Sequence, residues 1–167
     1  GDFSDIGSVL GEVQTRFDLT GKESEKITKK FVKFAEINNT DGVTSVQLVT
    51  RALRDAGIPL KDYEELLDKL TVGAQASGIS IDTLTESIAK YGAPMRQLGF
   101  DTDESISILA GWEKAGVNTQ IAFSGMKKAI SNWSASGKDA KVEFGKTLDE
   151  IKKAPSLAKA TTIAIEN

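Results

Sequence analysis

The chain has 167 residues, of which 40% are hydrophobic and 27% charged, within the range of a globular protein that buries a core. Its 21 Lys and Arg residues against 24 Asp and Glu give a formal net charge of -3, which argues against a general nucleic-acid or anionic-membrane binder. Cysteine and histidine are absent, which excludes disulfides, a thiol nucleophile and the usual zinc sites. No stretch of the sequence is apolar for long enough to span a membrane.

Apolar residues recur at helical spacing along almost the whole chain, beginning with Ile6, Leu10, Val13 and Phe17. In chain order, the apolar stripes run over Ile6–Phe17, Ile27–Ala35, Val46–Leu53, Tyr63–Leu70, Ile81–Tyr91, Ile108–Trp112, Ala122–Trp133 and Phe144–Ile151. No segment alternates with period two for long enough to indicate a strand. The sequence therefore predicts an all-α protein with a compact array of seven to nine short helices.

Four glycines mark predicted helix ends, namely Gly57, Gly78, Gly99 and Gly116. Each is followed by an apolar residue and then by a capping residue or proline that starts the next helix. Glycine is favoured just after the last turn of a helix, because it adopts the left-handed conformation without steric cost. The pattern predicts short helices joined by tight turns, in an orthogonal or bundle-like array rather than a helical solenoid.

Other boundary signals agree with this division. Asp101 and Glu104 have the spacing of a capping box, and Ser80 is placed to cap the helix that follows it. We expect Gly92-Ala93-Pro94 to end one helix, and 134–139 to separate two others.

The stripes predict one globular helical domain over residues 1–154. Residues 155–167 are weakly patterned, and we interpret them as the start of the next region of a longer protein. The amino terminus has neither an initiator methionine nor the features of a signal peptide, which is consistent with a fragment.

Several motifs resemble functional sites but lack essential residues. Gly21–Ser24 lacks the first glycine and the hydroxyl residue of a phosphate-binding loop. Asp101–Ser105 lacks the glycine and the final glutamate of a calcium loop, and the turn at Asn39, Asp41 and Gly42 lacks that glutamate too. We interpret these three segments as helix caps and turns.

Charged, small and aromatic residues also have simple structural explanations. The basic stripe Lys22, Lys26, Lys29, Lys30 and Lys33 is interrupted by acidic residues. In the acidic set Glu64, Glu65 and Asp68, we expect Glu64 and Asp68 to lie one turn apart on an exposed helix face. Gly7 and Gly11 form a GxxxG pattern outside any long apolar segment, and Trp112 and Trp133 continue apolar stripes. The sequence predicts no catalytic, cofactor-binding or metal-binding residues, and no enzyme activity.

The order of the sequence blocks resembles the conserved core of bacteriophage tail tape measure proteins. The blocks are Leu70–Ser80, Ser87–Pro94, Leu98–Phe100, Glu113–Asn118 and Gly125–Ile130, preceded by Phe31–Ala35 and Val49–Pro59. The resemblance covers roughly residues 20 to 150, and it depends on the order of the blocks rather than on any single motif.

This resemblance implies a structural domain that takes part in tail assembly and tail-length determination. Its partners would be tail tube, tail tip or assembly proteins, or further copies of itself, and no small-molecule substrate or specific nucleic acid is implied. It would be assembled in the cytoplasm of the bacterial host and lie in the tail tube or at the tip. A cellular helical domain for protein–protein interaction is the alternative, and a cell-wall hydrolase fragment using Glu64 or Asp68 is a third possibility.

Overall fold

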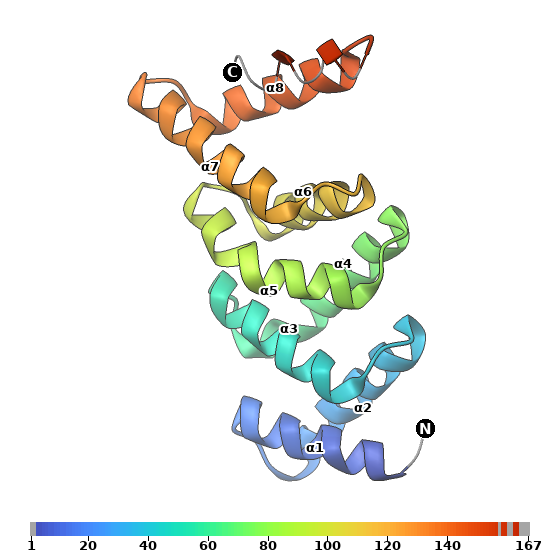
Figure 1. Ribbon diagram of the computed structural model, residues 1–167. Coiled ribbons are helices and arrows are strands. Elements are labelled where there is room, and N and C mark those ends of the chain that lie inside the picture. The colour runs from blue at the N-terminus through green and yellow to red at the C-terminus, as the bar shows by residue number, and fades with distance from the viewer. Residues whose placement is uncertain (1–2, 157, 160–161, 164–167) are drawn as a thin grey trace. The chain divides into compact units, whose positions relative to one another are not determined.

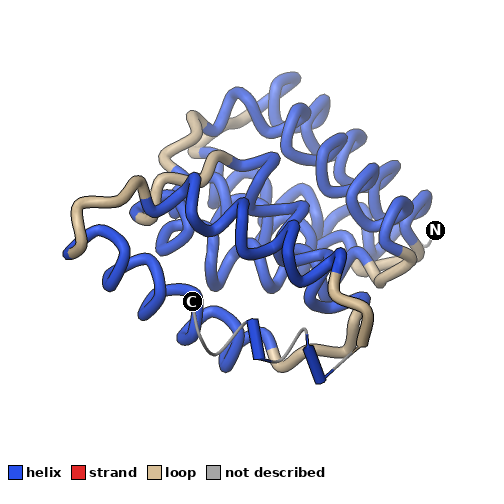
Figure 2. Tube along the Cα trace, turned by 90° about the horizontal axis from the view of Figure 1, so that it is seen from above, coloured by secondary structure: helices blue, strands red, loops and turns tan. Residues whose placement is uncertain are grey.

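The computed structural model describes residues 3–156, 158–159 and 162–163, and all regular structure in this part of the chain is helical (Figures 1 and 2). The elements are α1 (Phe3–Phe17), α2 (Gly21–Asn38), α3 (Gly42–Ala56), η1 (Leu60–Asp62, a 3-10 turn), α4 (Tyr63–Ser77), α5 (Ile81–Gln97), α6 (Thr102–Lys114), α7 (Thr119–Ala135) and α8 (Ala140–Lys153). The all-α prediction is confirmed, with eight α-helices among the described residues. Most of the expected segment 155–167, and the side chain of Ile151, lie outside the described residues.

Contacts between residues group the chain into two compact units. Unit 1 comprises Gly1–Gln97 and Asp101–Val117, and unit 2 comprises Leu98–Phe100 and Asn118–Asn167. Helices α1 to α6 therefore belong to unit 1, whereas α7 and α8 belong to unit 2. The single domain over 1–154 remains a prediction.

Unit 1 is a stack of three helix pairs in two layers. Helix α3 contacts both α1 and α5, and α4 contacts both α2 and α6, while each helix also contacts the next one along the chain (Figure 1). Contacts between alternate helices are typical of helical solenoids, in which each repeat packs on its neighbours. The prediction of a compact array of short helices is confirmed, and within unit 1 the helix pairs stack as in a solenoid, an arrangement that the sequence pattern had not favoured.

Within unit 1, similar polar contacts recur between successive helices of the same layer. In one layer, Arg54 of α3 donates to the carbonyl of Arg16 at the end of α1 (3.1 Å), and Arg96 of α5 donates to the carbonyl of Ala56 at the end of α3 (2.7 Å). A cation near a helix carboxyl end is favourable, because the last carbonyl groups have no partner within the helix.

The other layer repeats an ion pair. Lys30 of α2 pairs with Glu64 of α4 (2.8 Å), and Lys69 of α4 pairs with Asp103 of α6 (3.1 Å). Both members of the second pair come 39 positions after those of the first. Since exposed ion pairs contribute little to stability, the significance of these contacts is that they reveal an internal repeat.

The core of unit 1 begins with three aromatic rings from different helices. Phe31 stacks on Tyr63 with ring centroids 5.8 Å apart, and Phe17 meets both rings edge to face. Further along the stack the core is aliphatic. Its fully buried side chains include Val46, Val49, Leu53, Leu70, Leu84, Met95 and Leu109.

All four predicted helix-ending glycines are left-handed, with φ of 67° at Gly57, 74° at Gly78, 95° at Gly99 and 69° at Gly116. The prediction of helix ends at these positions is confirmed. The apolar residue after the glycine does not always pack back, because Val117 is 42% exposed.

The predicted helix end at Gly92-Ala93-Pro94 was wrong, since α5 continues to Gln97 with Pro94 inside it. The missing N–H of proline weakens a helix, but tertiary contacts support the final turn. The side chain of Met95 is completely buried, and Arg96 is bonded to the end of α3.

The predicted stripe of α1 was only partly correct. Val9, Val13 and Phe17 form its buried face, whereas Ile6 is 40% exposed and Leu10 is half-buried. Helix α1 therefore leaves two apolar side chains in its first half, Ile6 and Leu10, partly accessible.

Unit 2 is built on α7 and α8, which contact each other. Met126, Ile130 and Trp133 of α7 are buried, and Phe144 of α8 meets Phe100 edge to face with centroids 5.4 Å apart. The break predicted over 134–139 is confirmed, because α7 ends at Ala135 and α8 begins at Ala140.

Candidate functional site

Two of the three carboxylates that could suggest a hydrolase, Glu64 and Glu65, form ion pairs with lysines. Glu64 accepts hydrogen bonds from Lys30 (2.8 Å) and from the hydroxyl of Tyr63 (3.2 Å). The hydrogen bond from Lys30 lowers the pKa of Glu64 below its ordinary value. A glycosidase general acid requires the opposite shift, so the geometry assigns Glu64 to the contact between α2 and α4.

The basic stripe on α2 is a solvent-exposed face. Its five lysines are exposed, and the pKa of Lys30 is raised, first by its hydrogen bond to Glu64 and then by the charge of that carboxylate. Phe31 and Phe34 of the same helix are buried. Proteins that bind single strands stack bases on accessible aromatic rings, so this face lacks the second component of such a surface.

Two of the loop-like motifs act as helix caps, and the third, Gly21–Ser24, forms the first turn of α2. Asp101 and Glu104 each accept the backbone N–H of the other (2.8 and 2.9 Å), which confirms the capping box. Asp41 caps α3 by accepting from the N–H of Thr44 (2.7 Å), and this bond lowers the pKa of Asp41. Ser24 is buried and donates to the carbonyl of Gly21 (2.8 Å).

Metal ligands do not gather in space in the part of the chain that the structure describes, where no group of three or more acidic side chains is placed to hold an ion. None of the described helices is both long and apolar enough to cross a membrane. Of the two tryptophans, Trp133 is buried and Trp112 is half-buried. The predicted absence of catalytic, cofactor and metal residues remains a prediction.

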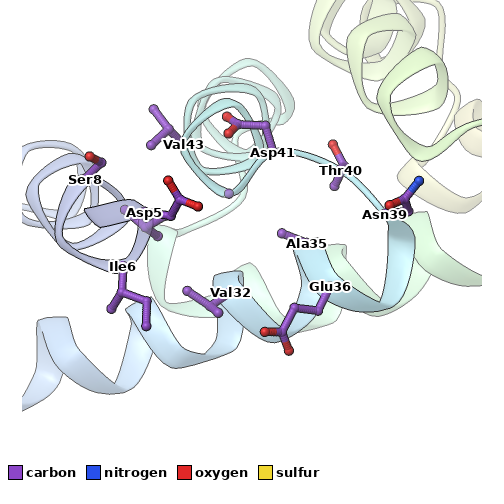
Figure 3. Close-up of a pocket in the computed structure, with 12 residues that line it drawn as sticks. Asp5, Ile6, Ser8, Val32, Ala35, Glu36, Asn39, Thr40, Asp41 and Val43 are labelled. Atoms are coloured by element: carbon purple, nitrogen blue, oxygen red, sulfur yellow. The ribbon is translucent and has the colours of Figure 1, made fainter. Parts of the chain in front are cut away.

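One groove in unit 1 lies beside the start of α1, and we call it the end groove (Figure 3). It has a volume of about 430 Å³ and lies between the start of α1, the end of α2 and the start of α3. Its lining residues are Asp5, Ile6, Ser8, Val9, Val32, Ala35, Glu36, Asn39, Thr40, Asp41, Gly42 and Val43.

The end groove combines apolar and acidic side chains. Ile6, Val32 and Val43 are partly or largely accessible, and two further lining residues, Asp5 and Glu36, are exposed and carry carboxylates. No Lys or Arg lines the groove. Such a surface favours a partner that offers an apolar side chain next to positive charge.

A second groove follows the neighbouring helices α4 and α6, and its lining is rich in small residues. Gly73 and Ala76 of α4 face Ala110 and Gly111 of α6, and Val72 at its edge is 64% exposed. Its charged residues have both signs (Asp68, Lys69, Asp103 and Lys114). This groove therefore shows no preference for partner charge.

Sequence reasoning selected neither groove. Helical spacing places Ile6 on the same face of α1 as Val13 and Phe17, so the sequence contained no signal that Ile6 would be exposed and line the end groove.

Comparison with known proteins gives one clear match. The model of the phage-related minor tail protein family matches residues 2–164, which is nearly the whole chain. No curated protein and no solved structure matches it significantly. Since the family model extends across both units, the chain belongs to the family of phage-related minor tail proteins.

Proposed function

We propose that the chain is a non-catalytic structural part of a tail tape measure protein, acting in tail assembly and in the determination of tail length. The observation that carries this proposal is the family match over residues 2–164. It is supported by the order of the tape-measure-like blocks, several of which coincide with helix junctions. Leu70–Ser80 spans the α4–α5 turn, and Glu113–Asn118 spans the turn before α7.

The structural features of the chain agree with a role in which it binds other proteins through helix surfaces and catalyses no reaction. The end groove and the α4–α6 groove are formed by helix faces, and Asp101, Glu104 and Glu64, which were first considered for chemistry, serve in a helix cap and an ion pair. Tail tube, tail tip and assembly proteins are the proposed partners. The proposed location is the tail, in the tube interior or at the tip.

A stop codon in the gene of the encoding phage tests this proposal. We expect lysates to lack tails of normal length in electron micrographs, and expression of the intact gene in the host to restore them. Normal tails without the protein would contradict the proposal and would favour the cellular interaction domain as the alternative.

A separate assay addresses the hydrolase possibility. We expect the purified chain to leave peptidoglycan intact in a zymogram. Clearing that disappears in a Glu64→Gln variant would instead assign an enzyme activity to the carboxylates of α4 and would overturn the non-catalytic part of the proposal.

A further inference from the structure

The groove between α4 and α6 lies within unit 1, and the internal repeat shows which residues create it. A shift of 39 positions carries the Lys30–Glu64 pair onto Lys69–Asp103, so it also relates the junction of α2 and α4 to the junction of α4 and α6. The two junctions can therefore be compared residue by residue.

Larger side chains occupy the earlier junction. Phe34 of α2 is buried, and Asn38 donates a hydrogen bond to Thr71 of α4 (3.3 Å). The residues 39 positions later are Gly73, Ser77 and Ala110. Ser77 donates to the carbonyl of Gly73 in its own helix (2.7 Å) rather than to α6. A groove of about 520 Å³ lies where these smaller residues replace the larger ones.

The groove offers apolar surface to a partner. Two of its lining residues, Ile106 and Ala110, are almost fully buried, and Val72 at its edge is largely exposed. A β-carbon added at Gly111 would meet nothing within 4 Å, so this side of the groove is open. An apolar side chain bound here would remove the surface of Val72 from water, which favours binding.

Helices α4 and α6 run in the same direction along the groove. Lys69 of α4 pairs with Asp103 of α6 (3.1 Å). About one turn further along both helices, a β-carbon at Gly73 would lie 2.7 Å from Ile106 Cγ2. The first turns of the two helices therefore lie towards one end of the groove, and their last turns lie towards the other.

The groove favours no net charge in its partner, but it carries charges of opposite sign at its two ends. Asp68 precedes Lys69 at the first end, and Lys114 lies in the last turn of α6 at the second. Among the described residues neither Asp68 nor Lys114 forms an ion pair, whereas Lys69 and Asp103 pair with each other. Asp103 and Lys114 are 11 positions apart, so about 16 Å separates the two ends along α6.

One kind of helix complements this arrangement. Positions i and i+11 lie on the same face of a helix, about 16 Å apart, and positions i+4 and i+7 lie between them. An acidic residue at one end of this pattern can reach Lys114 while a basic residue at the other end reaches Asp68. Apolar residues at the two middle positions then enter the groove, as in other complexes of a helix with an apolar groove.

We propose that the α4–α6 groove binds an amphipathic helix of a partner protein that carries this pattern of one acidic, two apolar and one basic residue. The carboxylate of the partner pairs with Lys114, its cationic group pairs with Asp68, and its apolar side chains cover Val72 between them. The inference does not depend on the proposed role in tail-length determination, because it concerns only the kind of segment that the groove accepts.

Titration of the intact chain with three synthetic peptides tests this proposal. Each peptide is a stapled helix of about 18 residues with the same apolar face, and the three differ only at their charged ends. One peptide has an acidic and a basic end, one has two acidic ends, and one has two basic ends. By fluorescence anisotropy, the peptide with opposite ends should bind about tenfold or more tightly than either of the others.

Two results of this titration overturn the proposal. The first is that no peptide binds at about 1 mM. The second is that all three bind equally, or that a peptide with like-charged ends binds most tightly.

A substitution at the open side of the groove locates the binding site. Gly111→Gln places a long polar side chain there and should weaken binding of the peptide with opposite ends by about tenfold or more. Gly11→Gln is the matched control, because Gly11 is also an exposed helix position where a β-carbon would meet nothing within 4 Å. It should leave binding unchanged, and thermal denaturation should show that both variants fold. Unchanged binding by Gly111→Gln would show that the peptide does not occupy the groove.

A change of specificity provides the decisive arm. Lys114→Glu makes both ends of the groove acidic, so the peptide with two basic ends should become the one that binds most tightly. Lys22→Glu makes the same charge change at an exposed position in the first turn of α2 and should leave the order of the three peptides unchanged. If Lys114→Glu leaves that order unchanged, or if Lys22→Glu alters it in the same way, the proposed pairing is wrong.

Discussion

The guanidinium group of Arg96 occupies the space that a β-carbon on Gly57 would need. It donates hydrogen bonds to the carbonyls of Ala56 (2.7 Å) and Asp55 (3.1 Å), the last two residues of α3. Gly57 itself is left-handed, with φ of 67°. One glycine therefore serves two purposes, because it ends α3 and leaves room for an arginine from α5 to cap it.

Replacement of Gly57 by alanine should be unusually costly. The left-handed backbone should cost about 1 kcal/mol for a residue with a β-carbon, and displacement of Arg96 should cost about 1 kcal/mol more through its lost hydrogen bonds. Gly116→Ala is the matched control, because Gly116 is also left-handed but has open space around it. Urea denaturation should show the larger loss for Gly57→Ala, and equal losses would contradict the role of Arg96.

Truncation of Met95 tests whether α5 is anchored beyond Pro94. The side chain of Met95 is completely buried, so Met95→Ala should leave a cavity and lower the free energy of unfolding by about 2–4 kcal/mol. Gln97→Ala, at an exposed position in the same turn, should change it by less than about 0.5 kcal/mol. A small effect of Met95→Ala would mean that the final turn of α5 is not part of the core.

Gly73 permits close packing between α4 and its neighbours. A β-carbon at this position would lie 2.7 Å from Ile106 Cγ2 and 3.1 Å from Leu84 Cδ2. Gly73→Ala should therefore destabilise the protein by about 1–3 kcal/mol through overpacking, despite the better helix propensity of alanine.

The control for this substitution is Gly111→Ala in α6, where a β-carbon would meet nothing within 4 Å. There only helix propensity changes, so we expect stabilisation by about 0.5–1 kcal/mol. If thermal denaturation gives the same sign for both variants, the packing at Gly73 is not as tight as described.

Tyr63 should make stability depend on pH in the alkaline range. Its side chain is 5% exposed, and burial, assisted by the charge of Glu64, raises the pKa of Tyr63 from 10.0 to about 12. Because the unfolded chain ionises first, the contribution of Tyr63 is complete below pH 10 and is lost as pH rises towards 12. The loss should be about 2 kcal/mol.

The measurement is denaturation across this pH range for the natural protein and for Tyr63→Phe. The phenylalanine variant should lack this part of the alkaline loss of stability. Absorbance titration in a Tyr91→Phe background, in which Tyr63 is the only tyrosine, should place ionisation near pH 12. Ionisation near pH 10 would show that the hydroxyl is not desolvated.

Local signals in the sequence were sufficient to predict the helices and many of their ends. Gly57 and Gly116 end helices because of their own backbone freedom, and the Asp101–Glu104 box involves residues only three positions apart. Such features depend only on residues that are close in the sequence, so they can be predicted without knowledge of the fold.

Features that depend on contacts between residues far apart in the sequence could not be predicted in this way. The continuation of α5 past Pro94 depends on the burial of Met95 and on the contact of Arg96 with α3. The solenoid-like stack was obscured because non-glycine residues, Asp18 and Asn39, take the left-handed position in the first helix pair. The end groove could not be recognised until α1 was seen to bury Val9 rather than Ile6.

The role in tail-length determination is the central claim, and changing the length of the chain tests it most directly. Residues 42–80 contain α3 and α4, one complete helix pair, and can be deleted or duplicated in frame in the phage gene. As one continuous helix at about 1.5 Å per residue, this segment would span about 60 Å. Gly7→Ala, at an open position on α1, controls for substitution without a change in length.

Tail lengths measured by electron microscopy should decrease with the deletion and increase with the duplication, by up to about 60 Å, while Gly7→Ala leaves them unchanged. Assembled tails of the same length in all three variants would contradict the claim that this chain helps to set tail length.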